Sequence, residues 1–124
     1  MIEQVDDYFT SISDLADEIL TQLQKEVNKL GFAPTALNLQ KPQEAIYRLE
    51  KDPSNGQYFL IGDWRDDKGI KTGSLQFNSE GQFFVEQDII QPHPTDNRWF
   101  VEAVSAWGTE TNIKSEARLI ANPE

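Results

Sequence analysis

A long run of helical periodicity at the start of the chain constrains the fold more than any other feature. Between residues 3 and 30 the apolar side chains recur every three or four positions, and no proline or glycine interrupts them. At 100° per residue they occupy an arc of roughly 140°, which is typical of a helix that lies on a core. Gly31 follows the last apolar position, where helices commonly end in a left-handed residue. We therefore predict one long amphipathic helix, which needs a second layer against its apolar stripe.

The opposite side of this predicted helix is acidic. Its acidic side chains fall within an arc of roughly 120°, and lysines come only near the C-terminal end. Acids first and lysines last complement the helix dipole, so a solvated face is a sufficient explanation. The alternative is an acidic docking surface, for which Asp14, Asp17 and Glu18 are the candidates.

An antiparallel meander is predicted in the middle of the chain, with strands at residues 57–65, 70–78 and 82–90. Apolar and polar residues alternate in these segments, as they do in strands with one buried face. The two turns, at residues 66–69 and 79–81, both end in glycine. Hairpin loops that finish with a left-handed residue place glycine at this position, so the two turns join neighbouring strands.

Turn chemistry also predicts which residues face each other across these strands. The second hairpin is expected to close between Asn78 and Gln82, and the first between Arg65 and Ile70. The apolar residues then gather on one face, which we expect to pack against the helix. The predicted pairs are Phe77 with Phe83, Leu75 with Val85, Leu60 with Leu75, Tyr58 with Phe77, and Gly62 with Gly73.

The second face of the predicted sheet is polar in the middle and apolar at one side. Its apolar members are Phe59, Ile61 and Phe84. An exposed apolar patch of this kind is generally covered by a second helix, a loop or another subunit. The sequence leaves these alternatives open, and it makes the three residues candidates for an interaction surface.

The segments around the meander are assigned from shorter patterns. Glu44–Lys51 fits an edge strand or one more helical turn, and the alternation of Tyr47 and Leu49 with charged residues favours the strand. Apolar residues between Trp99 and Trp107 recur at helical spacing, which predicts a second, shorter helix after the meander. Asn112–Ile120 alternates again and is a possible C-terminal strand.

Together these patterns predict an α+β fold in which a long N-terminal helix packs on an antiparallel β-meander of three to five strands. The chain has 124 residues, which suits a single domain over residues 1–124. It contains no cysteine, which excludes disulfides and cysteine metal sites. The acidic N-terminus is unlike a signal peptide, and no apolar run approaches the roughly 20 residues of a membrane span. We expect a cytoplasmic protein that does not bind membranes.

The net charge of −10, from 21 acidic and 11 basic residues, bears on possible partners. Such a surface repels nucleic-acid phosphates and anionic lipids, which argues against binding to either. It favours solubility, and it permits a basic protein partner or mimicry of DNA.

A candidate ligand site gathers around the only histidine of the chain. His93 lies between two prolines, and an unperturbed imidazole titrates near neutrality, so it is a candidate base. A zinc site is not expected, because there is one histidine and no cysteine. Trp64 and Arg65 could form a cation–π platform. Arg98 and Trp99 complete the set; Arg98 could bind an anion or pair with Glu102 on the predicted helix.

Two classes of function remain open from the sequence. We expect a non-catalytic protein-interaction module, of an adaptor or chaperone-like kind, because no catalytic, metal or cofactor motif is present. Its partner could be basic, or a second copy that forms a homodimer. In length, acidity and order of helix and meander the chain is similar to the small acidic secretion chaperones, although no residue motif carries that resemblance. The alternative is a small-molecule binder or enzyme with a pocket near His93, Trp64 and Arg98. A DNA-mimic inhibitor is a further alternative.

Overall fold

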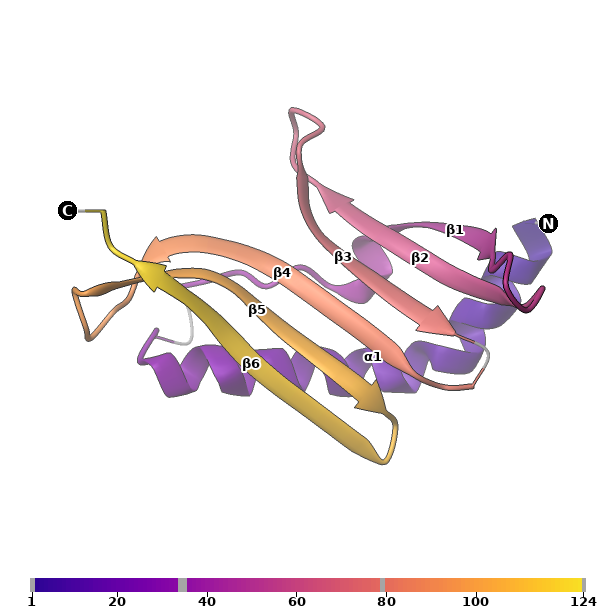
Figure 1. The fold of residues 1–124 in the computed structure, drawn as a ribbon, viewed down its shortest axis with the longest axis horizontal. Coiled ribbons are helices and arrows are strands. Elements are labelled where there is room, and N and C mark those ends of the chain that lie inside the picture. The colour runs from indigo at the N-terminus through magenta and orange to yellow at the C-terminus, as the bar shows by residue number, and fades with distance from the viewer. Residues whose placement is uncertain (1, 34–35, 79, 124) are drawn as a thin grey trace.

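One helix packs on one face of a six-stranded antiparallel sheet in the computed structural model of the chain (Figure 1). The structure describes residues 2–33, 36–78 and 80–123, with side chains from Ser13 onward. Every strand pairs with the next one along the chain, so the sheet is a simple meander. The elements are α1 (Ile2–Leu30), a 3₁₀ turn η1 (Pro42–Glu44), β1 (Ile46–Lys51), β2 (Tyr58–Arg65), β3 (Lys71–Asn78), β4 (Phe83–Pro92), β5 (Trp99–Thr109) and β6 (Asn112–Ala121).

The predicted N-terminal helix is confirmed as α1. Among its described side chains, the buried ones recur at helical spacing and join the core cluster with residues from the sheet. Gly31 ends the helix with a φ of 103°, and its N–H donates to the carbonyl oxygen of Asn28 over 3.0 Å. This is the left-handed termination that the glycine predicts. The buried helix residues are Leu15, Ala16, Ile19, Leu23 and Val27.

The predicted pairing of β3 with β4 is confirmed. Phe77 lies opposite Phe83 and Leu75 lies opposite Val85, and all four side chains are buried. The hairpin closes where the turn chemistry places it, since the Asn78 N–H donates to the carbonyl oxygen of Gln82 over 3.0 Å.

The predicted pairing of β2 with β3 is wrong by two residues. The hairpin closes between Asp66 and Ile70, one residue later than predicted. A bulge beside Trp64 shifts the pairing by one more residue. Leu60 therefore faces Phe77 instead of Leu75. Because the two offsets sum to an even number, every side chain stays on its predicted face.

Two glycines explain why this shifted pairing fits. Gly62 and Gly73 were predicted to face each other, but Gly62 lies opposite Leu75 and Gly73 lies opposite Trp64. A Cβ on Gly62 would lie 2.7 Å from a ring carbon of Tyr47, and one on Gly73 would lie 2.9 Å from a ring carbon of Trp64. The missing side chains thus make room for large neighbours.

The predicted second helix is wrong, because this segment forms strand β5. A bulge at Glu102 interrupts the alternation between Val101 and Ala103 in the pairing with β6. Val101 and Val104 are consequently both buried in the core, three positions apart. This spacing imitates a helix in the sequence, although the aromatic and β-branched residues of the segment favour a strand.

Both outer strands of the sheet follow the predicted alternation. Glu44–Lys51 contributes β1, so the strand assignment is confirmed and the helical alternative is wrong. The possible C-terminal strand is confirmed as β6, which brings the sheet to six strands instead of three to five. Ser115 on β6 ties the sheet to α1, since its hydroxyl accepts from the Gln22 amide at 2.9 Å and donates to Glu26 at 2.8 Å.

The connector between α1 and η1 is held on the sheet by Gln87, which is only 3 % exposed. Its side-chain oxygen accepts from the N–H of Gln40, and its amide nitrogen donates to the carbonyl oxygen of Gln40, both over 2.8 Å. The oxygen and the nitrogen of this buried amide thereby each have a partner, and the backbone of the connector gains the partners that a neighbouring strand would supply. Within the described residues, no helix is long and apolar enough to cross a membrane.

Candidate functional site

Trp64 and Arg65 of the predicted ligand site lie in different places, the first in the core and the second on the sheet surface. Trp64 is 2 % exposed, and its indole N–H donates to the carbonyl oxygen of Lys41 over 2.8 Å. The next residue, Arg65, points to the other face of β2 and pairs with Asp63 at 3.4 Å. The two side chains therefore do not form a shared cation–π platform.

His93 organises the connection between β4 and β5. Its ring Nδ1 accepts the backbone N–H groups of Thr95 and Asp96, at 3.1 and 3.0 Å. Because Nδ1 accepts both bonds, the neutral ring carries its proton on Nε2. The side chain fixes the shape of the turn, and among the described residues no carboxylate is hydrogen-bonded to the ring as a catalytic dyad requires.

Arg98 and Trp99 belong to the same connection. Arg98 forms a two-pronged pair with Asp96, with Nε to Oδ1 at 3.0 Å and Nη2 to Oδ2 at 2.7 Å. The predicted pairing with Glu102 is wrong, because no helix brings the two together. The hydrogen bonds from Arg98 lower the pKa of Asp96 to about 2. Trp99 is 37 % exposed at the start of β5.

The structure does not bring the two halves of the predicted ligand site together. The β2–β3 turn, after Arg65, lies at the top of the molecule in Figure 1, and the β4–β5 connection lies at its far left. The proposed pocket shared by His93, Trp64 and Arg98 is therefore not assembled by this fold.

The most distinctive exposed feature is the face of the sheet that α1 does not cover, which we call the open face. Figure 1 looks onto it, and no helix of the described chain lies there. Register places side chains in rows across the strands. One row runs Arg48, Ile61, Gln76, Phe84, Trp107, Lys114, and the next runs Ile46, Asp63, Ser74, Glu86, Ser105, Glu116.

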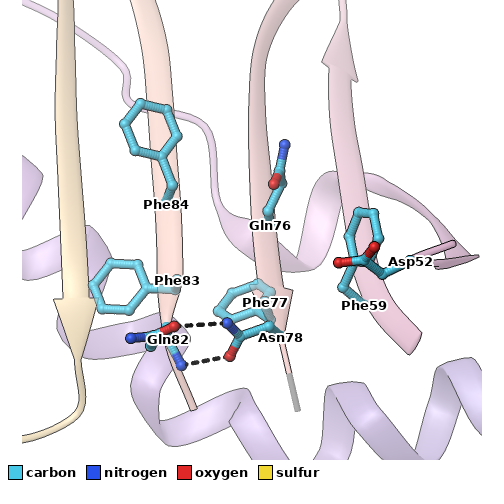
Figure 2. Close-up of a pocket in the computed structure, with 8 residues that line it drawn as sticks. All are labelled: Asp52, Phe59, Gln76, Phe77, Asn78, Gln82, Phe83 and Phe84. Atoms are coloured by element: carbon cyan, nitrogen blue, oxygen red, sulfur yellow. Dashed lines mark hydrogen bonds between the residues drawn. The ribbon is translucent and has the colours of Figure 1, made fainter. Parts of the chain in front are cut away.

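A first shallow hollow of about 350 Å³ opens at the β3–β4 end of this face. Phe59 on β2 and Phe84 on β4 stand on either side of Gln76 on β3 (Figure 2). Asn78 and Gln82 close the end of the hollow by bonding to each other, with the Asn78 amide donating to Gln82 Oε1 over 2.9 Å. Phe84 is 43 % exposed, which is a large share for a phenylalanine in a strand.

A second hollow, of about 330 Å³, adjoins the first and shares Phe84 with it. It lies over Ser105 on β5, which is small and surrounded by larger side chains. The lining residues are Phe84, Glu86, Ser105, Trp107, Glu116 and Arg118. Phe84 thus lines both depressions, together with Phe59 in the first and Trp107 in the second.

Two groups of charges on the open face form ion pairs. Toward β2, Asp63 is surrounded by cations: Arg48 at 3.5 Å, Arg65 at 3.4 Å and Lys71 at 3.6 Å. Toward β6, Arg118 is shared between Glu86 at 3.1 Å and Glu102 at 3.0 Å. The first group is therefore rich in positive charge and the second in negative charge.

The pKa of Asp88 is shifted first by burial, and carboxylates of the second group add to the shift. Its pKa is raised above the usual value of 3.8, first by burial and then by the nearby charge of Glu86. Glu102 raises the pKa further, while Arg118 and Lys71 offset part of the effect. A raised carboxyl pKa means that ionised Asp88 destabilises the folded state at neutral pH.

Replacing Asp88 with asparagine is therefore expected to raise the midpoint of thermal unfolding at pH 7. A folded-state pKa above the unfolded one favours the folded protein when the carboxyl is protonated, and that advantage is lost as the pH rises through the folded pKa. The benefit of the Asn variant should accordingly shrink as the pH falls below about 3.8. Calorimetry of both proteins across this range checks the expectation, and a lower midpoint for the Asn variant at pH 7 would contradict it.

The acidic residues of the predicted docking helix lie on the other side of the molecule from the open face. Asp14 and Glu18 are exposed on α1, and Asp17 is exposed with its Oδ1 accepting from the amide of Gln43 over 3.3 Å. The two sets of candidate interaction residues thus form separate surfaces. Phe59, Ile61 and Phe84 share the open face, whereas the helix acids do not belong to it.

Trp107, Ser105, Glu116 and Arg118 complete the open face, and sequence reasoning did not identify them as site residues. Trp107 was assigned to the buried stripe of a helix, so its place opposite Phe84 could not be foreseen. Among the described residues no group of three or more histidine and acidic side chains is arranged to hold a metal. Comparison with known proteins finds no family model, no curated protein and no solved structure that matches the chain.

Proposed function

We propose that this protein is a non-catalytic protein-interaction module that binds a basic partner protein through its open face. The observation that carries the proposal is Phe84, which stands exposed between two adjoining hollows on an uncovered sheet face. Protein interfaces commonly combine an exposed aromatic residue with shallow depressions beside it.

The arrangement of the aromatic residues supports this function. Phe59, Phe84 and Trp107 come from three different strands, so a partner that contacts them touches a broad, rigid surface. Aromatic side chains contribute much of the binding energy at such surfaces, because they bury a large area and lose little conformational freedom. The strands hold them in place before the partner arrives, which lowers the cost of binding.

Charge supports a basic partner over a second copy of the chain. The net charge of −10 attracts a basic protein over a distance and makes two copies repel each other. On the open face itself, the acidic group around Arg118 has more carboxylates than cations. A partner with apolar side chains beside basic ones would match this surface.

Substitution of Phe84 tests the proposal. The wild-type chain, Phe84→Ser and Ile90→Ser are each immobilised and exposed to extract from the source cell. Ile90 is 63 % exposed and lines neither hollow, so it controls for the loss of an exposed apolar side chain. Basic proteins should be retained by the wild type and by Ile90→Ser, and retention should fall at least about tenfold for Phe84→Ser, as expected for a central aromatic contact.

Two results would contradict this proposal. Equal retention by all three proteins would place any interaction away from Phe84. A stable dimer of the isolated chain in light scattering that Phe84→Ser dissociates would make a second copy the occupant of the open face. Thermal unfolding of each variant confirms that the fold is retained.

A further inference from the structure

The hollow over Ser105 exposes a hydroxyl group that has no hydrogen-bond partner among the described residues. Ser105 is 8 % exposed and lines the hollow. Its hydroxyl makes no hydrogen bond with any residue that the structure describes. Because the hydroxyl opens into the hollow and can both donate and accept, it is available to a group that enters there.

The aromatic walls of the same hollow suit a positive charge. Phe84 and Trp107 lie directly opposite each other on β4 and β5, and both line the hollow. The face of an aromatic ring attracts a cation, and tryptophan attracts it most strongly. Trp107 is partly exposed, so a side chain from outside can reach its ring.

Carboxylates complete the site. Glu86 and Glu116 flank Ser105 in register on the neighbouring strands, and both line the hollow. Glu86 already binds Arg118, whereas Glu116 is exposed and forms no ion pair with a described residue. Arg118 shows what this environment binds, because its guanidinium is held between Glu86 and Glu102. A second cation could form an ion pair with the carboxylate of Glu116.

We propose that the hollow over Ser105 binds the guanidinium or ammonium group of an arginine or lysine side chain that the partner presents. The cation would lie against Trp107, pair with Glu116 and donate a hydrogen bond to the Ser105 hydroxyl. This inference rests on the proposed function and names the part of the partner that the open face recognises. Apolar side chains next to that arginine or lysine would contact Phe84.

A blocked tripeptide provides the probe, because a single arginine side chain is small enough to enter a hollow of about 330 Å³. Acetyl-Ala-Arg-Ala-amide is titrated into the isotope-labelled protein at about 0.15 M salt, where distant charges are largely screened. The neutral control is the same peptide with citrulline, which keeps the shape of arginine without its charge. We expect saturable shifts of the Trp107 indole N–H and the Ser105 amide with the arginine peptide, and none with citrulline.

Two matched variants separate the hollow from the general acidity of the protein. Glu116→Gln should weaken arginine-peptide binding about fivefold, because it removes the unpaired carboxylate. Glu80→Gln removes the same charge from an exposed position in the β3–β4 turn, outside this hollow. It should change binding less than about twofold.

Equal shifts with arginine and citrulline, or equal weakening by the two variants, would overturn the inference. Failure of this inference can be distinguished from failure of the proposed function. If partner retention depends on Phe84 and the arginine peptide does not bind the hollow, only the cation site is wrong. If retention does not depend on Phe84, the proposed function is wrong whether or not the peptide binds.

Discussion

Replacing Trp64 with alanine is expected to lower the free energy of unfolding by about 3–5 kcal/mol, the usual cost of truncating a buried tryptophan. Trp64 is 2 % exposed and belongs to the core cluster that joins the sheet to α1. The substitution leaves a cavity and also removes the donor to the carbonyl oxygen of Lys41. Domains of this size are stable by roughly 5–15 kcal/mol, so the variant should be close to unfolding.

Urea denaturation of the variant, with Trp107→Ala as the matched control, measures this effect. Trp107 is the same residue type, but it lies half-buried on the open face. Its truncation should cost less than about 2 kcal/mol, because little packing is lost. Similar losses for both variants would contradict the assignment of Trp64 to the core and of Trp107 to an exposed surface.

Replacing Gly73 with alanine is expected to destabilise the protein by about 2–3 kcal/mol or more, the cost of overpacking a well-packed core. Alanine ordinarily stabilises a strand relative to glycine by roughly 0.5–1 kcal/mol. At position 73, however, its Cβ would lie 2.6 Å from the backbone oxygen of Glu86 and 2.9 Å from the Trp64 ring. A backbone atom within a sheet cannot move aside without disturbing the pairing of β3 with β4.

Gly81→Ala separates this steric effect from an effect of backbone conformation. Gly81 has a φ of 81° and no atom within 4 Å of an added Cβ. Alanine there should therefore lower the free energy of unfolding only through its left-handed backbone conformation. That cost is roughly 1–2 kcal/mol. Gly73 is not one of the glycines with positive φ. If Gly73→Ala were as stable as the wild type in denaturant, the close packing of β2, β3 and β4 would be wrong.

The sequence was sufficient to predict those parts of the fold that local rules determine. The apolar stripe and Gly31 define α1, and the glycine that ends the β3–β4 turn determines the pairing of Phe77 with Phe83. The faces of β2 were also predictable, because the alternation of side chains survives a shift of two residues.

Bulges account for the parts that could not be predicted. The extra residue beside Trp64, together with a hairpin that closes one residue later than predicted, changes the partners of β2. The bulge at Glu102 gives β5 a helix-like spacing of its buried valines. A bulge leaves no distinctive signal in a single sequence, since it depends on how neighbouring strands fit together. The position of Trp107 could not be predicted either. It lies opposite Phe84 only because β4 pairs with β5, and that pairing is not visible in the sequence.

The candidate site was predictable only in part. Phe59, Ile61 and Phe84 were identified as a shared apolar face, and the structure places them on one surface. The hollow over Ser105 required the register of three strands, since Glu86 and Glu116 flank the serine only in the folded sheet. His93 attracted attention as the only histidine, but its Nδ1 is used by the backbone of its own turn.

Site-specific photo-crosslinking in the source cell tests the central claim, that partners bind the open face, most directly. A photoreactive phenylalanine analogue replaces Phe84 in one variant and Glu18, on the exposed side of α1, in another. We expect the analogue at position 84 to form discrete adducts with a basic protein, and the analogue at position 18 to form none above background. Adducts from position 18 alone would show that the acidic helix is the binding surface and would contradict this account.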